Sequence, residues 1–310
     1  MPKSTLSNPR GVRGAASLCA VAALAYLFVQ DLLTIFVSAL MGMRVQGASL
    51  SDPVGFSVAA QGLLGIVVAA GSIVLPLWWL LRATRLQTPD LRILLPAPWS
   101  PAFCLVVFLG LANAGNLFGG LLARGLGVTT SSTALPAGDL DLFIRYFSLC
   151  VVPAVLEEIY FRGALQGIMR PSGSSVAIFA PALLFALLHL DLAQSITALV
   201  CGIFLGWLVE RSGSILPGML LHFINNTLAF LSLYLRQYAP EQLAVVYELI
   251  LLVALPLAAL FLVWRVKVQG FSFSAGLRGG MEPLAVFTSL PYTVCVLFLM
   301  GLTVYLYRVG

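Results

Sequence analysis

The stretch LAVVYELILLVALPLAALFLVW, residues 243–264, holds one charged side chain, Glu248, in a run long enough to cross a membrane. A hydrocarbon core about 30 Å thick needs roughly 20 apolar residues per helix. Other runs of this kind fill most of the chain: 15–41, 54–81, 101–123, 142–160, 174–193, 194–210, 214–235 and 284–307. The sequence therefore predicts an all-α fold, a polytopic transmembrane helix bundle of about eight or nine spans.

The composition excludes a soluble globular protein. Of 310 residues, 60% are hydrophobic and 9% are charged, and the mean hydropathy is +1.00. Soluble domains carry about 25% charged residues, so this chain cannot cover a globule with polar surface. We expect an integral, multi-pass membrane protein surrounded by the lipid bilayer, in the plasma (inner) membrane if the source is prokaryotic.

Basic residues concentrate in alternate loops between the apolar runs, and the net charge is +5. One set of loops and loop edges contains Lys3, Arg10, Arg13, Arg82, Arg85, Arg92, Arg162, Arg170, Arg211, Arg265, Lys267 and Arg278. The other set contains Arg44, Arg124, Arg236 and Arg308, with Arg145 close to that side. Because cytoplasmic loops carry the excess of Lys and Arg, this pattern predicts a cytoplasmic N-terminus.

Two alternative readings of the basic residues are less favoured. No stripe of Lys and Arg alternates with exposed aromatic residues, so nucleic acid is not an expected partner. The first apolar run follows a basic segment as in a signal peptide, but it is too long for one and lacks a clear cleavage site. We therefore expect this run to be a retained helix.

Two adjacent glutamates interrupt the apolar run around residue 157, in the sequence EEIYFR, residues 157–162. A charge at mid-bilayer costs roughly 2.5–3.5 kcal/mol on insertion scales. Glu158 and Arg162 are four residues apart and can pair on one helix face, whereas Glu157 points about 100° away from its neighbour. The spacing alone also fits a helix end at the membrane surface, where charged residues are less costly.

Both histidines of the chain lie in apolar runs, in FALLH, residues 185–189, and in HFINN, residues 222–226. His222 and Asn226 are one helical turn apart, so they face the same neighbour. If Glu157 and His189 meet them around a water-filled cavity, the carboxylate and one imidazole can activate water as a general base. The remaining histidine and the asparagine amide suit the oxyanion of a tetrahedral intermediate, which is the chemistry of amide-bond hydrolysis.

These three segments resemble, in this order, the EExxxR, FxxxH and HxxxN/D motifs of the CPBP family of intramembrane proteases. That family includes the type II CAAX prenyl proteases, the bacterial Abi proteins and the myxosortases. The resemblance implies a glutamate-dependent endopeptidase in which Glu157 and His189 activate water while His222 and Asn226 hold the oxyanion. It also implies that Glu158 and Arg162 form a supporting pair that fixes the position of Glu157.

The resemblance covers about residues 140–236, which we expect to be the catalytic helical core. Residues 1–139 then contribute about three N-terminal spans, and residues 237–310 contribute about two C-terminal spans. The implied substrate is a membrane-anchored or C-terminally tailed protein or peptide, cut at its tail or at the membrane edge. Because the charge pattern puts EExxxR near the cytoplasmic face, we expect access from that side.

Other chemistries remain open at this point. Glu157, His189 and His222 could supply a zinc shell with one open position. No HExxH segment is present, and the Asn226 amide suits an oxyanion better than zinc, so we favour catalysis without metal or cofactor. Intramembrane acids and histidines also fit a proton-coupled transporter. The third alternative is a non-catalytic membrane scaffold that has kept the motif residues.

Overall fold

A computed structural model describes residues 11–42, 44–46, 49–51, 57–84, 86–128, 134–270, 272–273, 277 and 279–309. The helices are α1 Gly11–Leu40, α2 Val58–Thr84, α3 Pro101–Gly125, α4 Asp139–Tyr146, α5 Val152–Glu157, α6 Gln166–Met169, α7 Ser174–Leu187, α8 Leu192–Ser212, α9 Leu216–Tyr238, α10 Glu241–Leu249, α11 Leu255–Val268 and α12 Leu290–Val309. A short antiparallel hairpin pairs β1 Arg44–Gln46 with β2 Ser49–Ser51. Short 3₁₀ turns cover Thr88–Leu91, Arg170–Ser172 and Pro283–Thr288.

Seven helices in the described part of the chain are long and apolar enough to cross a membrane. They are α1, α2, α3, α8, α9, α12 and the continuous α10–α11 segment, whose two parts are joined by a π-helical turn, Ile250–Ala254. The apolar run 142–160 lies in the segmented helix α4–α6, and the run 174–193 begins with the shorter helix α7. The predicted polytopic helix bundle is confirmed.

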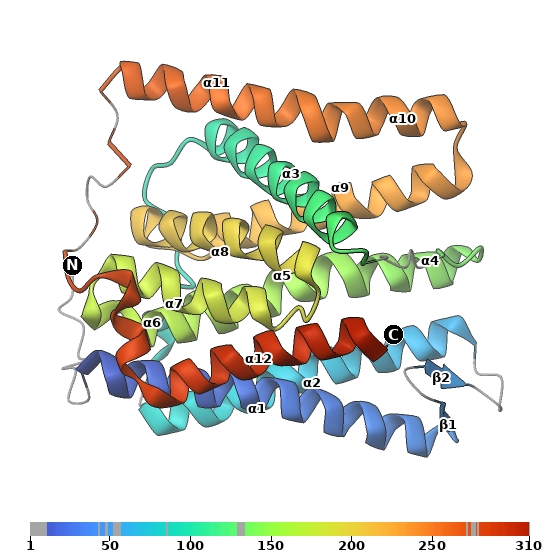
Figure 1. Cartoon of the computed structure of the whole chain (residues 1–310), viewed down its shortest axis with the longest axis horizontal. Coiled ribbons are helices and arrows are strands. Elements are labelled where there is room, and N and C mark those ends of the chain that lie inside the picture. The colour runs from blue at the N-terminus through green and yellow to red at the C-terminus, as the bar shows by residue number, and fades with distance from the viewer. Residues whose placement is uncertain are drawn as a thin grey trace.

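If α4–α6 and α10–α11 are each taken as one helix, consecutive helices run in opposite directions along the bundle (Figure 1). We call the end where α1 begins and α2 ends the basic end, because Arg13, Arg82 and Arg265 lie there in the first or last turns of α1, α2 and α11. The opposite end is where α1 ends and where α4 begins (Figure 1). Lys3, Arg10, Arg85 and Arg278 lie outside the described residues.

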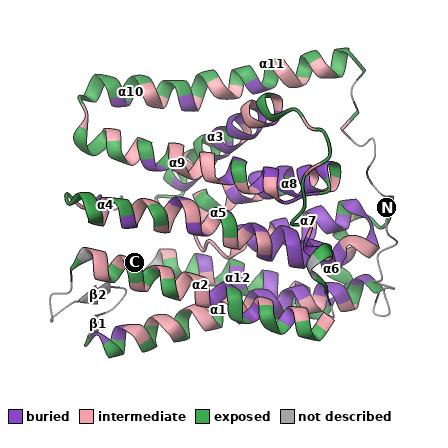
Figure 2. Ribbon diagram, turned by 180° about the vertical axis from the view of Figure 1, so that it is seen from behind, coloured by how far each residue is buried: buried purple, intermediate pink, exposed green. Residues whose placement is uncertain are grey.

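The segmented helix α4–α6 and helix α7 lie between two groups of helices (Figure 1). One group contains α1 with α2 and α12, both of which pack on α1, and the other contains α3, α8, α9 and α10–α11. Buried residues concentrate on α7, α8 and the neighbouring part of α4–α6, whereas α10–α11 is mostly exposed (Figure 2). The residues that the sequence marks as functional therefore lie on the most enclosed helices.

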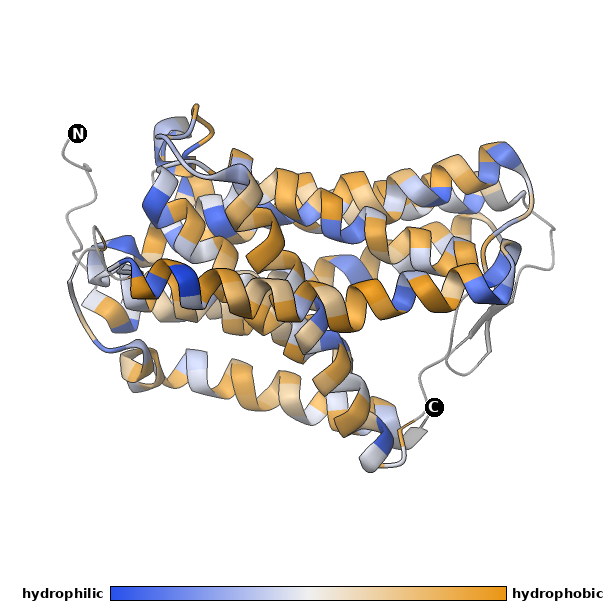
Figure 3. Cartoon of the chain, turned by 90° about the horizontal axis from the view of Figure 1, so that it is seen from above, coloured by the Kyte–Doolittle hydropathy of each residue, from blue (hydrophilic) through white to orange (hydrophobic). Residues whose placement is uncertain are grey.

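Apolar side chains face outward along the lengths of the outer helices. Leu260 is 67% exposed and Trp264 is 56% exposed on α11, as expected for a surface in contact with lipid. Hydrophilic residues gather toward the two ends of the bundle (Figure 3). This distribution fits an integral membrane protein, because lipid offers no hydrogen bonds to polar groups at mid-depth.

Small residues allow the close approach of α3 to α8. A Cβ added at Gly119 would lie 2.7 Å from the backbone oxygen of Ala193, and one added at Gly115 would lie 3.1 Å from the Cα of Thr197. The GxxxG spacing on α3 thus marks a helix contact in which only glycine fits, as in many membrane bundles. This contact fixes the start of α8, which forms one wall of the site described next.

Candidate active site

The helix that carries EEIYFR is interrupted on both sides of α5 by π-helical turns, Phe147–Val151 and Glu158–Leu165. Pro153 has no backbone N–H, so the carbonyl of Leu149 four residues earlier loses its usual helical donor. The Asn226 side chain on α9 replaces that donor, with Nδ2 3.2 Å from Leu149 O. The proline therefore removes a competing donor from the acceptor through which Asn226 binds the glutamate-bearing helix.

Glu158 and Arg162 lie inside the bundle behind the site. The Glu158 side chain is 0% exposed and that of Arg162 is 2% exposed, and Oε1 of Glu158 lies 2.9 Å from Nη1 of Arg162. The N–H direction is not aligned on this oxygen, so the contact is an ion pair rather than a hydrogen bond. The guanidinium also lies 4.4 Å from the ring centre of Phe185, a cation–π geometry.

The imidazole of His222 lies between the two glutamates. Its Nδ1 is 3.1 Å from Oε1 of Glu158, and its Nε2 is 3.8 Å from Oε2 of Glu157. Since an ionised carboxylate only accepts hydrogen bonds, Nδ1 carries the proton toward Glu158. The buried carboxylate therefore orients the ring so that Nε2 points toward Glu157, whose side chain is 19% exposed.

His189 follows the end of α7 and is oriented by its own helix. Its Nδ1 lies 2.8 Å from the carbonyl oxygen of Phe185, one turn earlier. Because a carbonyl oxygen only accepts hydrogen bonds, Nδ1 carries the ring proton in this contact. Nε2 is then the nitrogen with a free lone pair. The Phe185 ring is edge-on to both imidazoles, with centroids 4.9 Å from His189 and 6.2 Å from His222.

One cavity of about 400 Å³ brings the four predicted catalytic side chains together. Glu157 from α5, His189 beyond α7, and His222 and Asn226 from α9 all line it. Glu158 and Arg162 do not line it and lie behind its wall. The Glu157–His222 separation of 3.8 Å is short enough for one water molecule to contact both groups.

Several cavity residues lie outside the three motifs. Asn116 of α3 accepts a hydrogen bond from the Thr197 hydroxyl of α8 at 2.8 Å, and both line the cavity together with Gln194 and Asn225. The sequence signal for them was a polar residue inside an apolar run. That signal does not say which helix faces which, so these residues could not be assigned to the site in advance.

The described residues do not offer an evident metal centre. Among them, no group of three His, Cys, Asp or Glu side chains is placed to hold a metal ion. Glu157, His189 and His222 all line the cavity, but they do not form such a group. The three side chains thus do not fit the compact shell that zinc requires, and we derive no step through a metal.

Two other acidic residues near the core have structural partners. Asp191 caps the start of α8, with its Oδ1 2.7 Å from the backbone N of Gln194. Glu210 lies toward the basic end, where Oε1 is 2.9 Å from Arg170 Nε and 3.3 Å from Arg92 Nη1. Neither carboxylate lines the cavity, so both stabilise the helices around it.

The residues that line the cavity show on which side of the glutamate the open space lies. The cavity extends from Glu157 along Pro153 and Leu149 of its helix, and from His222 to Leu233 of α9. Both directions lead toward the opposite end of the bundle. The open space of this cavity therefore lies on the side of the glutamate away from the basic end, the end from which access was expected.

Comparison with known proteins gives one match. The family model described as type II CAAX prenyl endopeptidase Rce1-like matches residues 139–228, a segment that contains all three motifs. No curated protein and no solved structure matches the chain. The match confirms the resemblance that the motifs indicated. Residues 139–228 of this membrane protein form a domain of the Rce1-like type II CAAX prenyl endopeptidase family, whose members are glutamate-dependent intramembrane proteases.

Proposed function

We propose that this protein is an intramembrane endopeptidase that hydrolyses a peptide bond of a membrane-anchored or C-terminally tailed protein. The observation that carries the proposal is the convergence of Glu157, His189, His222 and Asn226 on one cavity, with the Glu157 carboxylate 3.8 Å from an imidazole nitrogen. These groups come from three helical segments far apart in sequence. A merely structural role would not require all four to face the same open space.

In the proposed mechanism, Glu157 is the general base and water is the nucleophile. The carboxylate accepts a proton from a water molecule held between Glu157 and His189, and the resulting hydroxide attacks the scissile carbonyl carbon. A new C–O bond forms while the carbonyl electrons move to oxygen. When the C–N bond breaks, Glu157 returns the proton to the leaving amine, so its charge is restored at the end of the cycle.

The oxyanion is stabilised by His222 and Asn226. The second N–H of the Asn226 amide is available for this, because the first binds the Leu149 carbonyl. His222 donates through Nε2 only when both ring nitrogens carry protons, with Nδ1–H held by Glu158. Preorganised donors of this kind contribute about 2.7–4 kcal/mol each to catalysis. Glu158 and Arg162 act as positioning residues, because they touch the imidazole and the helix rather than the substrate.

The catalytic core is residues 140–236, flanked by the N-terminal helices in 1–139 and the C-terminal helices in 237–310. The flanking regions are not merely peripheral in this proposal. Phe108 and Asn116 of α3 contribute to the cavity wall, so the N-terminal helices help to shape the substrate site. No metal or cofactor takes part.

The test compares the membrane and surface proteomes of cells that express the wild type, Glu157→Gln or Glu241→Gln. The first variant keeps the shape of the side chain but removes the base. Glu241 is an exposed acid in the first turn of α10, so Glu241→Gln is the matched control. We expect unprocessed tails to accumulate with Glu157→Gln and not with the control.

His189→Ala and His222→Ala extend this test to the imidazoles, and each should abolish cleavage in protein that still inserts and folds. If all three variants process every protein normally, the chain is a scaffold and the proposal is wrong. If they lose ion or solute flux without any change in processing, the chain is a transporter. The zinc content of the purified wild type, measured together with its activity after chelation, tests the metal-free mechanism separately.

A further inference from the structure

Helix α7 is too short to cross a membrane. Its 14 residues span about 21 Å at 1.5 Å per residue, against a hydrocarbon core of about 30 Å. Its neighbours α1, with 30 residues, and α9, with 23 residues, are much longer. The turn between α7 and α8, at residues 188–191, lies short of the opposite end that α1 reaches (Figure 1), and His189 lies in this turn.

Irregular backbone at membrane depth is tolerated where it is buried in protein or lines a water-filled space. The α7–α8 turn adjoins the catalytic cavity, which His189 and Gln194 both line. Gln194 is exposed at the start of α8. The short α7–α8 hairpin thus leaves an open space between its turn and the opposite end of the bundle. This space leads from that end to Glu157.

The path from Glu157 toward the basic end is closed by packed side chains. Tyr160 and Leu165 are 0% exposed and Phe161 is 2% exposed. Beyond them, Gln166 is buried and donates to Glu210 at 2.9 Å. A Cβ on Gly206 would lie 3.2 Å from the Gln166 side chain, so α8 packs closely against this helix. No comparable opening toward the basic end is formed by these described residues.

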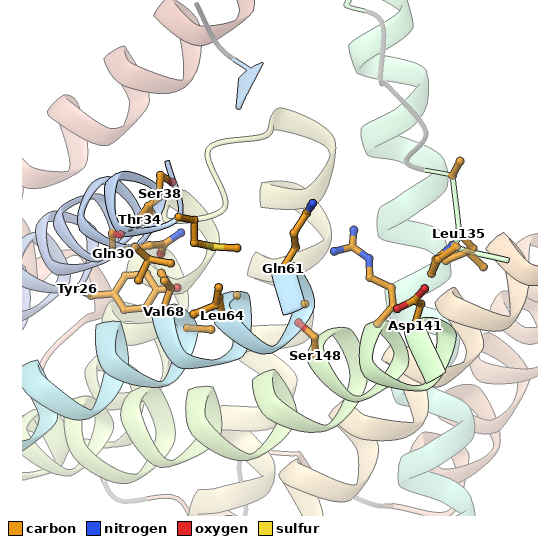
Figure 4. A pocket seen from close by; sticks show the side chains of 18 residues that line it. Tyr26, Gln30, Thr34, Ser38, Gln61, Leu64, Val68, Leu135, Asp141 and Ser148 are labelled. Atoms are coloured by element: carbon orange, nitrogen blue, oxygen red, sulfur yellow. Dashed lines mark hydrogen bonds between the residues drawn. The ribbon is translucent and has the colours of Figure 1, made fainter. Parts of the chain in front are cut away.

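A second cavity, of about 640 Å³, lies on the other side of the glutamate-bearing helix and extends toward the same opposite end. Figure 4 shows side chains from α1, α2 and α4 around it. Gln30, Thr34 and Ser38 of α1 line it at intervals of four residues, together with Gln61 and Ser148. Polar side chains within apolar helices usually face water or the protein interior, so this second cavity adds polar, enclosed space toward the opposite end.

We infer that the catalytic cavity opens on the face of the membrane away from the cytoplasm, and that the substrate is a segment already transported across the membrane. The basic residues gather at the end that the cavity does not reach, and cytoplasmic loops carry the excess of Lys and Arg. The cleavable substrate is then the exported tail of a membrane-anchored protein. This inference rests on the proposed function, because it specifies where that peptidase meets its substrate.

Single-cysteine labelling tests the direction of opening without any need for catalysis. The background carries Cys201→Ala, because Cys201 lines the cavity; the other four thiols are buried, at 0–3% exposure. Gln194→Cys and Ala229→Cys report on the cavity, which both residues line. The reagent is a charged methanethiosulfonate that does not cross membranes, applied to intact spheroplasts and to inside-out vesicles.

Two exposed serines serve as matched controls for the two ends of the bundle. Ser57 precedes α2 at the opposite end, and Ser100 precedes α3 at the basic end. We expect both cavity cysteines and Ser57→Cys to react in spheroplasts, and Ser100→Cys to react in inside-out vesicles. Reaction of the cavity cysteines only in inside-out vesicles overturns the inference, and so does a failure to react from either side.

The labelling result is independent of whether the protein cleaves anything. If processing is unchanged in Glu157→Gln cells, the proposed function fails while the labelling pattern stands on its own. If unprocessed tails accumulate but the cavity labels from the cytoplasm, the protease survives and the orientation is wrong. In the expected case, the accumulating tails in Glu157→Gln cells are accessible to protease added outside spheroplasts.

Discussion

Replacing Arg162 by methionine should strongly destabilise the protein, because it leaves the buried Glu158 carboxylate without its counter-ion. At 2.9 Å between the charged atoms, the attraction is about 6 kcal/mol with an effective dielectric constant of about 20. The desolvation of both groups offsets part of this attraction. Breaking a buried pair by removing one partner costs about 3–5 kcal/mol, which is the loss that we expect for Arg162→Met.

The double variant Glu158→Gln/Arg162→Met should be less damaging than either single change. Both buried charges are then gone, and the carbonyl oxygen of the introduced amide can still accept the His222 Nδ1 proton. We expect the double variant to lie within about 2 kcal/mol of the wild type. Reversible unfolding in mixed micelles with increasing SDS, followed by circular dichroism, measures the free energies of unfolding of Glu158→Gln, Arg162→Met and the double variant.

An exposed ion pair provides the control for this cycle. Arg236 Nε lies 3.1 Å from Glu248 Oε1, but the arginine side chain is 62% exposed. Such pairs contribute about 0–1 kcal/mol, so Arg236→Met should have a small effect. The reasoning is refuted if Arg162→Met costs less than about 1 kcal/mol, or if the double variant costs the sum of the two single changes.

Three further changes test the packing and the site. Pro153→Ala restores a backbone donor that competes with Asn226 for the Leu149 carbonyl. Turnover of an identified tail peptide should fall about 2- to 12-fold, the equivalent of 0.5–1.5 kcal/mol, with no loss of stability. Turnover at the wild-type rate would contradict this. Gly119→Ala brings a methyl group 2.7 Å from a backbone oxygen of α8 and should cost about 1–3 kcal/mol of unfolding free energy. Gly120→Ala, which meets no atom within 4 Å, should cost nothing in the same assay. Asp191→Ala removes the cap of α8 and should cost about 1 kcal/mol in thermal unfolding, whereas Asp191→Asn should cost less.

The sequence was sufficient to predict the helix bundle because a membrane imposes one simple requirement on every segment that crosses it. Each apolar run must bond its own backbone groups internally, so the runs predict helices without reference to their neighbours. The exception is the run 174–193, which continues past the end of α7 at Leu187 into a turn. Hydropathy does not distinguish a lipid-facing residue from one that lines an enclosed turn, and Leu188 and Leu190 are as apolar as any helix residue.

The sequence was sufficient to predict which polar side chains share one cavity, whereas their catalytic roles remain a proposal. Four polar side chains in apolar surroundings, in the order of a known motif set, pointed to Glu157, His189, His222 and Asn226, and these line one cavity. Their geometry was not predictable. That Glu158 contacts His222 depends on the packing of two helices 64 residues apart in sequence, and no local pattern encodes that packing.

The direction of the cavity was also beyond the sequence. The charge pattern predicts which end of the bundle meets the cytoplasm, but it does not say on which side of Glu157 the side chains are closely packed. That depends on where bulky side chains such as Tyr160 and Phe161 pack. In the sequence, either residue could equally well face lipid or pack inside the bundle. The direction that we infer rests on this packing and on the short α7, and both became visible only in three dimensions.

The π-helical turns on both sides of α5 make the winding of this helix sensitive to changes in length. A regular α-helix advances about 100° per residue, and each π turn accommodates additional residues in the winding. The direction in which side chains project from the helix therefore shifts before and after Glu157. As a result, Leu149 contacts α9 while Glu158 and Arg162 remain enclosed. Removing one residue from Phe147–Val151 would rotate α4 by roughly that angle against α5. A natural variant of this protein is thus freer to exchange side chains in this segment than to gain or lose one.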